Sequence, residues 1–202
     1  MTIRAVIFDI GGVLEIDPAT DWLERWAGRL GLSWPEDMTA RLEPISRAGN
    51  IGMITLAQAE QQIAAVLGLD AAQLGRFMED LWTEYLGTLN TELARYFRAL
   101  RPRYKTGILS NSFVGARERE RDAYGFEDLC DVVVYSHEEG LEKPDPRFYR
   151  IVTDRLGVRP DEAVLVDDHE TCVQGARDAG LAAVLFCDNE QAVAGLEAYL
   201  RG

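Results

Sequence analysis

The stretch Val6-Ile7-Phe8-Asp9-Ile10-Gly11-Gly12-Val13-Leu14 is the part of the sequence that decides the fold. Three apolar residues predict a buried strand, an aspartate ends it, and two glycines follow directly. In an open α/β sheet, ligands bind outside the carboxyl ends of the strands. Asp9 therefore stands where a nucleophile would be placed, and the amides of Gly11 and Gly12 are free to approach an anion. Gly11 also occupies the position, two residues after Asp9, where a reaction that needs a local acid or base would have a second carboxylate.

The 202-residue chain has an ordinary globular composition, with 47% hydrophobic and 27% charged residues. This length predicts one core domain with a modest insertion. The formal net charge of −13 argues against nucleic acid or an anionic membrane as partner, since the sequence offers no basic stripe. Three scattered cysteines, with neither a membrane-spanning run nor a signal-peptide pattern, predict a reduced, cytoplasmic protein. We expect a monomer or a homodimer.

Short apolar runs recur along the chain, and from the second run onward helical patterns separate them. Strands that alternate with helices predict a parallel sheet with right-handed crossovers. Continuous apolar strands are typical of a sheet that helices cover on both faces. The sequence thus predicts a doubly wound, Rossmann-like α/β core with strands at residues 5–8, 106–109, 132–135, 163–166 and 182–186. Helices are expected at residues 114–124, 146–156, 172–179 and 190–200.

The stretch from about residue 18 to residue 86 breaks this alternation and contains helical patterns only. Thr55-Leu56-Ala57-Gln58 and Asp70-Ala71-Ala72-Gln73 have the form of capping boxes, each followed by apolar residues at helical spacing. An insertion directly after the first strand would lie above the catalytic edge of the sheet, where a lid can exclude water and select substrate. We therefore expect a core domain of residues 1–16 and 87–202, and an inserted helical cap domain of residues 17–86.

Two features of this insertion concern its interior. Gly49-Asn50-Ile51-Gly52 is the strongest turn signal within it. Four aromatic residues could form either the core of the cap or a cage around a substrate, and core packing is the commoner role for such residues. They are Trp22, Trp26, Trp82 and Tyr85.

Residues that could carry phosphoryl chemistry follow four of the predicted strands. Asp9 ends the first strand, Ser110-Asn111-Ser112 follows the second, Lys143 comes after a loop beyond the third, and Asp167-Asp168 ends the fourth. A carboxylate nucleophile, a hydroxyl donor, a cation and a carboxylate pair are what phosphoryl transfer through an aspartyl phosphate uses. Several acids in one place repel one another, and a hard divalent cation such as Mg²⁺, which takes oxygen ligands, removes that repulsion.

These four clusters, in this order, resemble those of the haloacid dehalogenase-like (HAD) hydrolase superfamily. The resemblance covers essentially the whole chain, and the helical insertion is similar to that of the subfamily with a helical cap after the first strand. Each motif is weak alone, but their order at successive strand ends makes them specific. The most characteristic segments are Glu142-Lys143-Pro144-Asp145-Pro146-Arg147-Phe148-Tyr149, Val166-Asp167-Asp168-His169 and Gly175-Ala176-Arg177-Asp178-Ala179-Gly180.

The resemblance implies a role in phosphoryl transfer for three clusters. Asp9 matches the nucleophile that attacks phosphorus and becomes phosphorylated. Ser110 matches the hydroxyl that hydrogen-bonds the phosphoryl oxygens, and Asn111 beside it is expected to orient substrate. Lys143 matches the cation that neutralises Asp9 and the transferring group. The expected phosphate-binding residues are Gly11, Gly12, Ser110, Asn111 and Lys143.

The resemblance also implies a magnesium site. Asp168 matches a direct ligand, and Asp167 matches a ligand or a residue one layer behind it. Asp9 would contribute a carboxylate oxygen. In the family, the residue two after the nucleophile ligates Mg²⁺ through its backbone carbonyl, and Gly11 retains that carbonyl.

Gly11 is where the chain departs from the family pattern. Most phosphatases of the family have Asp there, which protonates the leaving group and then activates water, and such help is worth ~10²–10⁴-fold in rate. Glu15, Asp17, His169 or a residue of the cap could be recruited in its place. A leaving group that departs easily, such as that of an anomeric sugar phosphate, needs less protonation.

The leading functional hypothesis is a Mg²⁺-dependent phosphatase of small phosphorylated metabolites, with an aspartyl-phosphate intermediate on Asp9. The first alternative is a 2-haloacid dehalogenase-type hydrolase, in which Asp9 attacks carbon without a metal. The pair Asp167-Asp168 argues against it, because it would repel a carboxylate substrate. The second alternative is a catalytically weak or non-catalytic HAD-like binding protein, motivated by Gly11.

Overall fold

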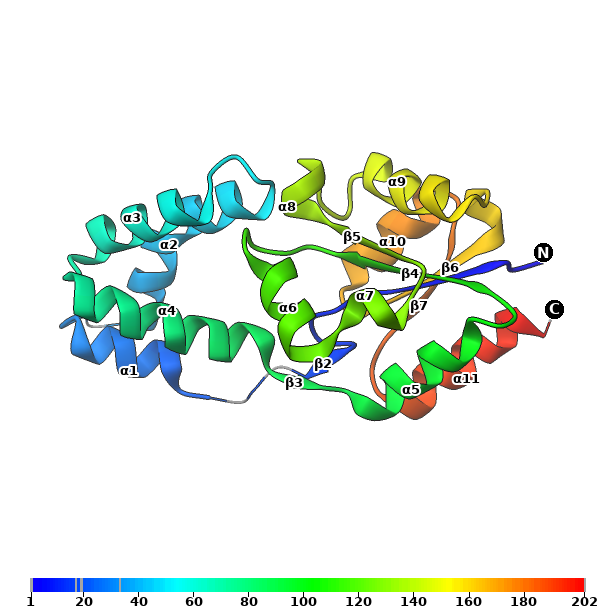
Figure 1. The fold of residues 1–202 in the computed structure, drawn as a ribbon, viewed down its shortest axis with the longest axis horizontal. Helices are drawn as coiled ribbons and strands as arrows, with labels where there is room; N and C mark the ends of the chain where they lie inside the picture. Colours follow the sequence, from blue (N-terminus) through cyan, green and yellow to red (C-terminus); the bar gives the residue numbers. More distant parts are fainter. Residues whose placement is uncertain (1, 17, 19, 33, 202) are drawn as a thin grey trace.

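The computed structural model describes residues 2–16, 18, 20–32 and 34–201. A five-stranded parallel sheet in the order β5-β4-β1-β6-β7 has helices on both faces, and a group of helices lies beside it (Figure 1). This arrangement confirms the predicted doubly wound α/β core, and each strand lies within one residue of its expected bounds. The strands are β1 (Ala5–Phe8), β4 (Lys105–Ser110), β5 (Val132–Tyr135), β6 (Ala163–Asp167) and β7 (Ala182–Leu185).

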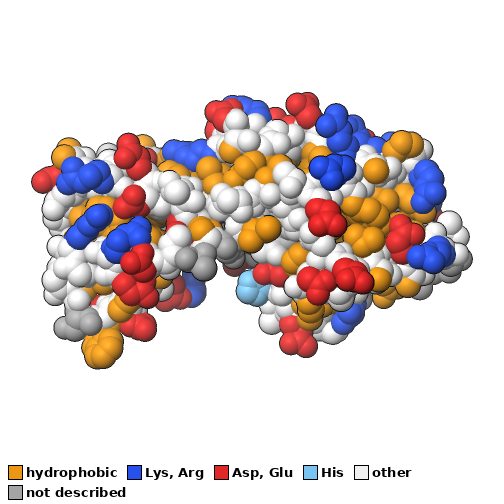
Figure 2. All heavy atoms as spheres, turned by 90° about the horizontal axis from the view of Figure 1, so that it is seen from below, with side chains coloured by type: hydrophobic (Ala, Val, Ile, Leu, Met, Phe, Trp, Pro, Cys, Tyr) orange, Lys and Arg blue, Asp and Glu red, His pale blue; other side chains and the backbone are white. Residues whose placement is uncertain are grey.

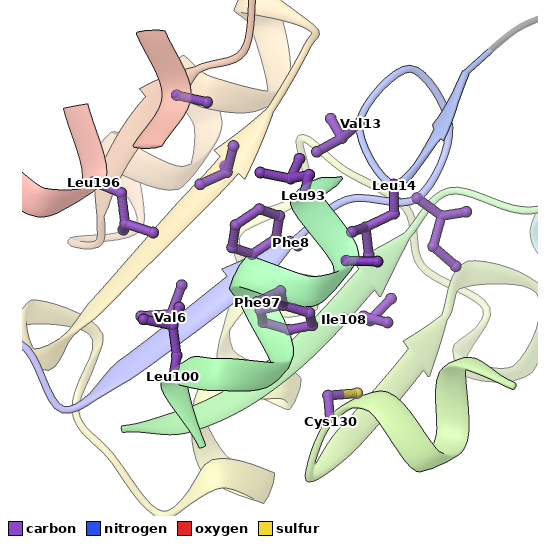
Figure 3. Close-up of a cluster of buried hydrophobic side chains, with 14 of the residues drawn as sticks. Val6, Phe8, Val13, Leu14, Leu93, Phe97, Leu100, Ile108, Cys130 and Leu196 are labelled. Atoms are coloured by element: carbon purple, nitrogen blue, oxygen red, sulfur yellow. The ribbon is translucent and has the colours of Figure 1, made fainter. Parts of the chain in front are cut away.

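Strand β1 is central because both of its faces are covered by apolar side chains. Val6 and Phe8 point to one face, where they pack with α5 (Thr91–Leu100) and α11 (Asn189–Leu200) (Figure 3). Ala5 and Ile7 point to the other face, against α9 (Pro146–Leu156) and α10 (Glu170–Asp178). A shift of the strand register by one residue would exchange these two sets, so the packing fixes where the strand ends. Asp9 is consequently held at the carboxyl edge of the sheet.

Shorter elements complete the core around the two edges of the sheet. A two-stranded antiparallel ribbon joins the start and the end of the insertion, formed by β2 (Glu15–Ile16) and β3 (Thr88–Leu89). The other elements are α6 (Ala116–Tyr124), α7 (Phe126–Leu129), α8 (Ser136–Glu139) and η1 (Pro160–Glu162). In the described part of the chain, no helix has the length and apolar character needed to cross a membrane.

The insertion is a bundle of four helices with its own apolar core, which confirms the expected helical cap (Figure 1). Both capping boxes form as predicted, with Thr55 accepting from the Gln58 amide and Asp70 from the Gln73 amide. The cap core includes Trp26, Met38, Ile63, Phe77 and Trp82. The domain boundaries at residues 17 and 86 stay a prediction. The cap helices are α1 (Trp22–Arg29), α2 (Pro35–Asn50), α3 (Leu56–Leu67) and α4 (Ala71–Leu86).

Three local features differ from what the sequence led us to expect. Helix α2 continues to Asn50, so the turn within the insertion begins at Ile51 rather than at Gly49. Residues 136–139, expected as a loop, form one turn of helix, α8. No prediction covered residues 91–100, which form α5 and are capped by Asn90. Short or tertiary-stabilised elements of this kind carry little periodic signal of their own.

Candidate active site

The carboxyl edge of the sheet brings the predicted clusters together. Asp9 follows β1, Ser110 ends β4, Asp167 ends β6, and Lys143 lies on the segment between α8 and α9. All four side chains are buried, with Asp9 the most exposed at 7%. Oxygen atoms of Asp9, Asp167 and Asp168 lie within 4.8 Å of one another. Residues that are up to about 160 positions apart in the sequence therefore share one buried polar cluster.

Lys143 is the cation of this cluster. Its Nζ lies 2.8 Å from Asp9 Oδ2 and 2.7 Å from Asp167 Oδ2. Burial by itself would lower the pKa of Lys143, but the charges of Asp9 and Asp167 together hold it above its ordinary value. The ammonium group thus stays charged, and it can neutralise a carboxylate nucleophile together with an incoming anion.

Asp9 lies in surroundings that disfavour its ionised form. Burial raises its pKa to about 7, and Lys143 opposes this rise, while the neighbouring Asp167 adds to it. The Ile10 amide also donates a hydrogen bond of 2.8 Å to Asp9 Oδ1. A nucleophilic carboxylate must be ionised, so Asp9 benefits from any additional positive charge placed beside it.

The donor set fits a hard divalent cation such as Mg²⁺. Asp168 Oδ1 is buried and accepts no hydrogen bond from the described residues. A bound cation would give this carboxylate oxygen the partner that buried polar atoms normally have. Asp167 is more committed, because its Oδ2 contacts Lys143 and its Oδ1 accepts from the His169 amide at 2.9 Å. Asp168 and Asp9 are accordingly the better placed ligands, with Asp167 holding Lys143 behind them.

The two glycines after the first strand have different reasons for being glycine. Gly12 has a φ of +68°, and a Cβ there would lie 2.3 Å from Asp168 Oδ2, so a side chain would push Asp168 out of the cluster. Gly11 has ordinary negative φ, and a Cβ there would meet no atom within 4 Å. The Gly11 position thus opens onto free space, where a larger side chain would fit.

Ser110 and Asn111 differ in how free their side chains are. Among the described residues, Ser110 Oγ has only a long contact of 3.5 Å to the Asn111 carbonyl, so its hydroxyl is available to a ligand. The Asn111 amide group is engaged with the backbone of Lys143, donating to its carbonyl at 3.0 Å and accepting from its amide at 2.8 Å. The side chain of Asn111 thus holds the segment that carries Lys143, and the expectation that Asn111 orients substrate, through its side chain or its backbone, stays a prediction.

A cavity of about 850 Å³ opens above this cluster, between the cap and the core. Gly11, Ser110 and Asn111 line its base. Of the four aromatic residues in question, Trp26 and Trp82 are buried in the cap core, whereas Trp22 and Tyr85 line the cavity. Trp22 and Tyr85 also pack against the cap core, so core packing holds for all four, and a cage around a substrate stays a prediction for these two. Figure 2 shows a notch between the cap and the core, with acidic side chains on both sides of it.

The candidates for the acid or base that Gly11 does not supply differ in whether they line the cavity. Glu15 is buried on β2 and lines the cavity. His169 is exposed at the start of α10 and is not among the residues that line the cavity. Asp17 lies outside the described residues. Phe113 lines the cavity three residues after Ser110 and was missed at the level of sequence, because a lone phenylalanine after a strand gives no functional signal.

Comparisons with known proteins agree with this geometry. Phosphatase MT3486 of Mycobacterium tuberculosis is 29% identical over 202 residues, which covers 92% of this chain and 88% of that protein. The phosphoglycolate phosphatase of Xanthomonas campestris is 27% identical over 190 residues, covering 90% of this chain and 81% of its own length.

A solved structure shares the fold over the same extent. It is a HAD family enzyme from Bacteroides thetaiotaomicron in complex with magnesium and inorganic phosphate, with a TM-score of 0.78 and 23% identity. The match covers 91% of this chain and 93% of that one. A family model described as haloacid dehalogenase-like hydrolase matches residues 3–180. The chain therefore belongs to the haloacid dehalogenase-like hydrolase family.

Proposed function

We propose that this hydrolase is a Mg²⁺-dependent phosphatase of small phosphorylated metabolites that forms an aspartyl phosphate on Asp9. The observation that carries the proposal is the buried cluster in which Lys143 bridges Asp9 and Asp167, next in sequence or in the sheet to Gly11 and Ser110, which line the cavity. Such a cluster combines a nucleophilic carboxylate with a fixed positive charge. The names of the two phosphatase relatives support the same reaction class.

Each residue of the cluster has a part in the proposed reaction. The phosphoryl group of the substrate rests beside Ser110, whose hydroxyl donates a hydrogen bond to a phosphoryl oxygen. Asp9 attacks phosphorus while the alcohol of the substrate leaves. Lys143 balances the charge that gathers between Asp9 and the phosphoryl oxygens. Water then attacks phosphorus, which releases phosphate and regenerates Asp9.

Mg²⁺ would be held by Asp9, Asp168 and the Gly11 carbonyl, and it would supply positive charge that keeps Asp9 ionised and stabilises the phosphoryl oxygens. Asp167 keeps Lys143 in place beside Asp9, at 2.7 Å. The cap covers the cluster and limits its contact with bulk water, which protects the acyl phosphate from uncontrolled hydrolysis. The side chain of Asn111 fixes the backbone of Lys143 through two hydrogen bonds.

The test is phosphate release from a panel of phosphate monoesters, with and without Mg²⁺. Asp9→Asn should lower turnover by roughly 10³-fold or more, since the variant lacks the nucleophile. Asp122→Asn, which changes an exposed aspartate on α6, is the matched control and should retain activity. Halide release from a haloacid in the presence of a chelator would instead favour the dehalogenase alternative. Phosphate binding without any turnover would favour the binding protein.

A further inference from the structure

The walls of the cavity are apolar over most of their extent. They come from all four cap helices and from the segment after β4. The apolar residues that face it include Trp22, Leu42, Ile45, Ile63, Leu81 and Phe113. Its volume of about 850 Å³ is that of a site for a complete small ligand rather than for phosphate alone. The part of the substrate beyond the phosphoryl group would therefore be buried against hydrocarbon and aromatic rings.

The charged side chains that line the cavity are mostly acidic. They are the carboxyl groups of Glu15, Glu43, Glu84 and Glu142. Within the described part of the chain, Arg47 is the one Lys or Arg that lines it. The Arg47 guanidinium is paired with Glu43 at 2.5 Å, and its side chain is 72% exposed, so it is already engaged at the rim. Glu43 and Arg47 offset each other, so the repulsion that a leaving group with a carboxylate or a second phosphate would meet comes from acids such as Glu84 and Glu142.

The base of the cavity has an open place at a glycine, which has no proton donor in its side chain. Gly11 lies there, and a Cβ added to it would meet no atom within 4 Å. Unless another residue such as Glu15 takes over the role of proton donor, the alcohol leaves as an anion. A phenol loses its proton at a pH of about 10, as tyrosine does, whereas water itself has a pKa of about 15.7. An aryl or enol oxygen therefore departs much more readily than an alkyl alcohol.

From the apolar walls, the acidic residues of the lining and the open place at Gly11, we infer that the substrate is an aryl phosphate, the phosphate monoester of an uncharged aromatic alcohol. This inference rests on the proposed phosphatase function. Asp9 forms a bond to phosphorus as the bond from phosphorus to the aryl oxygen breaks, and the electron pair leaves with the phenolate. Water then adds hydroxide to phosphorus, Asp9 is released, and the second proton of that water neutralises the phenolate. The products are a phenol and hydrogen phosphate.

The experiment compares kcat/KM for four esters with the Mg²⁺-loaded enzyme. Phenyl phosphate should exceed benzyl phosphate, which has similar apolar bulk but an alkyl oxygen, by at least ~10²-fold, the scale of acid assistance. Benzyl phosphate should in turn exceed glycerol phosphate by about 10-fold or more, because only the former fills the apolar walls. The ester of para-carboxyphenol should fall at least about 10-fold below phenyl phosphate, because acidic residues of the lining repel its carboxylate.

A pair of variants tests the walls directly. Leu42→Asn places an amide in the lining and should lower kcat/KM for phenyl phosphate by about 10-fold, with little change for glycerol phosphate. Val66→Asn changes an exposed apolar side chain of α3 that does not line the cavity, and it should change neither value.

The outcomes separate this inference from the proposed function. If polar sugar phosphates or para-carboxyphenyl phosphate are hydrolysed as well as phenyl phosphate, the aryl-phosphate inference is overturned and the phosphatase function stands. If benzyl and phenyl phosphate react equally fast, another residue such as Glu15 donates the proton, and the preference for an aryl leaving group is refuted. If no ester yields phosphate in an Asp9-dependent way, both the function and the inference are overturned.

Discussion

Gly11 determines how readily the leaving group must depart without help from an acid at this site. Because its φ is ordinary and its surroundings are open, Gly11→Asp should fold without strain and place a carboxyl group beside the phosphoryl site. We predict that this variant raises turnover of benzyl phosphate by ~10²-fold and that of phenyl phosphate much less, since acid assistance matters most for poor leaving groups. Steady-state kinetics on the two esters measure the effect.

The matched control for this prediction is Gly11→Asn, which has nearly the same size but cannot donate a carboxyl proton. It should show no gain with benzyl phosphate. An equal gain in both variants would mean that the added side chain acts by positioning the substrate, and an unchanged rate in Gly11→Asp would mean that acid assistance is already present.

Glu120 is a second residue whose environment predicts a measurable effect, in this case on how stability depends on pH. It is fully buried on α6, and Tyr135 Oη donates a hydrogen bond of 2.6 Å to its Oε2. Burial raises the pKa of Glu120 to about 7, from an ordinary value of 4.5. The folded state thus binds this proton more tightly than the unfolded chain does. The resulting stability is fully present below pH 4.5 and is lost as the pH rises through about 7.

We predict that Glu120→Gln removes this contribution to the pH dependence of the free energy of unfolding. Between pH 4.5 and pH 8, the free energy of unfolding of the variant should rise by roughly 3 kcal/mol relative to that of the wild type. Each unit of pKa shift corresponds to about 1.4 kcal/mol. Urea unfolding at several pH values provides the measurement. Asp9 also titrates, but it does so in both proteins, so its contribution cancels in the comparison. Glu118→Gln, an exposed site on the same helix, should leave the pH dependence unchanged. Parallel stability curves for Glu120→Gln and the wild type would refute the prediction.

At the scale of elements, the turn after α2 fastens the cap to the core. Ser136 Oγ, on α8, donates a hydrogen bond of 2.6 Å to the carbonyl of Asn50, at the end of α2. Gly52 has a φ of +65°, and a Cβ there would lie 2.0 Å from the carbonyl oxygen of His137. The close approach of the two backbones therefore requires glycine at this position.

We predict that Gly52→Ala separates this turn from α8 and lowers kcat/KM for a cavity-filling ester by about 10-fold, because misplacement of a lid costs catalysis. Gly68→Ala is the matched control, since Gly68 has a φ of +68° but no atom within 4 Å of an added Cβ. Both variants should lose about 1 kcal/mol of stability through backbone strain, and Gly52→Ala should lose more because its Cβ would clash with the His137 carbonyl. Only Gly52→Ala should lower kcat/KM. Equal kcat/KM values in the two variants would contradict the role of the turn.

The elements also show how far the sequence could predict this molecule. Strand β1 is a buried apolar run that Asp9 follows, and β6 is one that ends in Asp167, so both the core and the acidic cluster could be placed from the pattern alone. The ribbon of β2 and β3 could not, because two-residue strands exist only through their pairing across the insertion. The engagement of the Asn111 side chain with Lys143 depends on a contact between segments that no local pattern describes. The cavity lining likewise follows from how the cap helices pack.

At the scale of the whole molecule, the net charge of −13 opposes the approach of an anionic substrate. We predict that kcat/KM for phenyl phosphate rises by about two- to five-fold as salt increases from about 0.02 M to about 0.2 M, at constant free Mg²⁺, because the Debye length shortens to about 10 Å or less. The value of kcat should change little, since the bound substrate is screened from solvent ions. A steady fall of kcat/KM with salt would show that a local positive field steers the substrate instead.

The covalent role of Asp9 is the central claim, and trapping the intermediate tests it most directly. Wild-type enzyme is mixed with a substrate that carries a radiolabelled phosphoryl group, quenched in acid within a single turnover, digested and mapped. We predict a hydroxylamine-sensitive label on the peptide that contains Asp9, and none in Asp9→Asn. Product formation without labelled peptide, or a label on a different residue, would contradict the covalent role of Asp9.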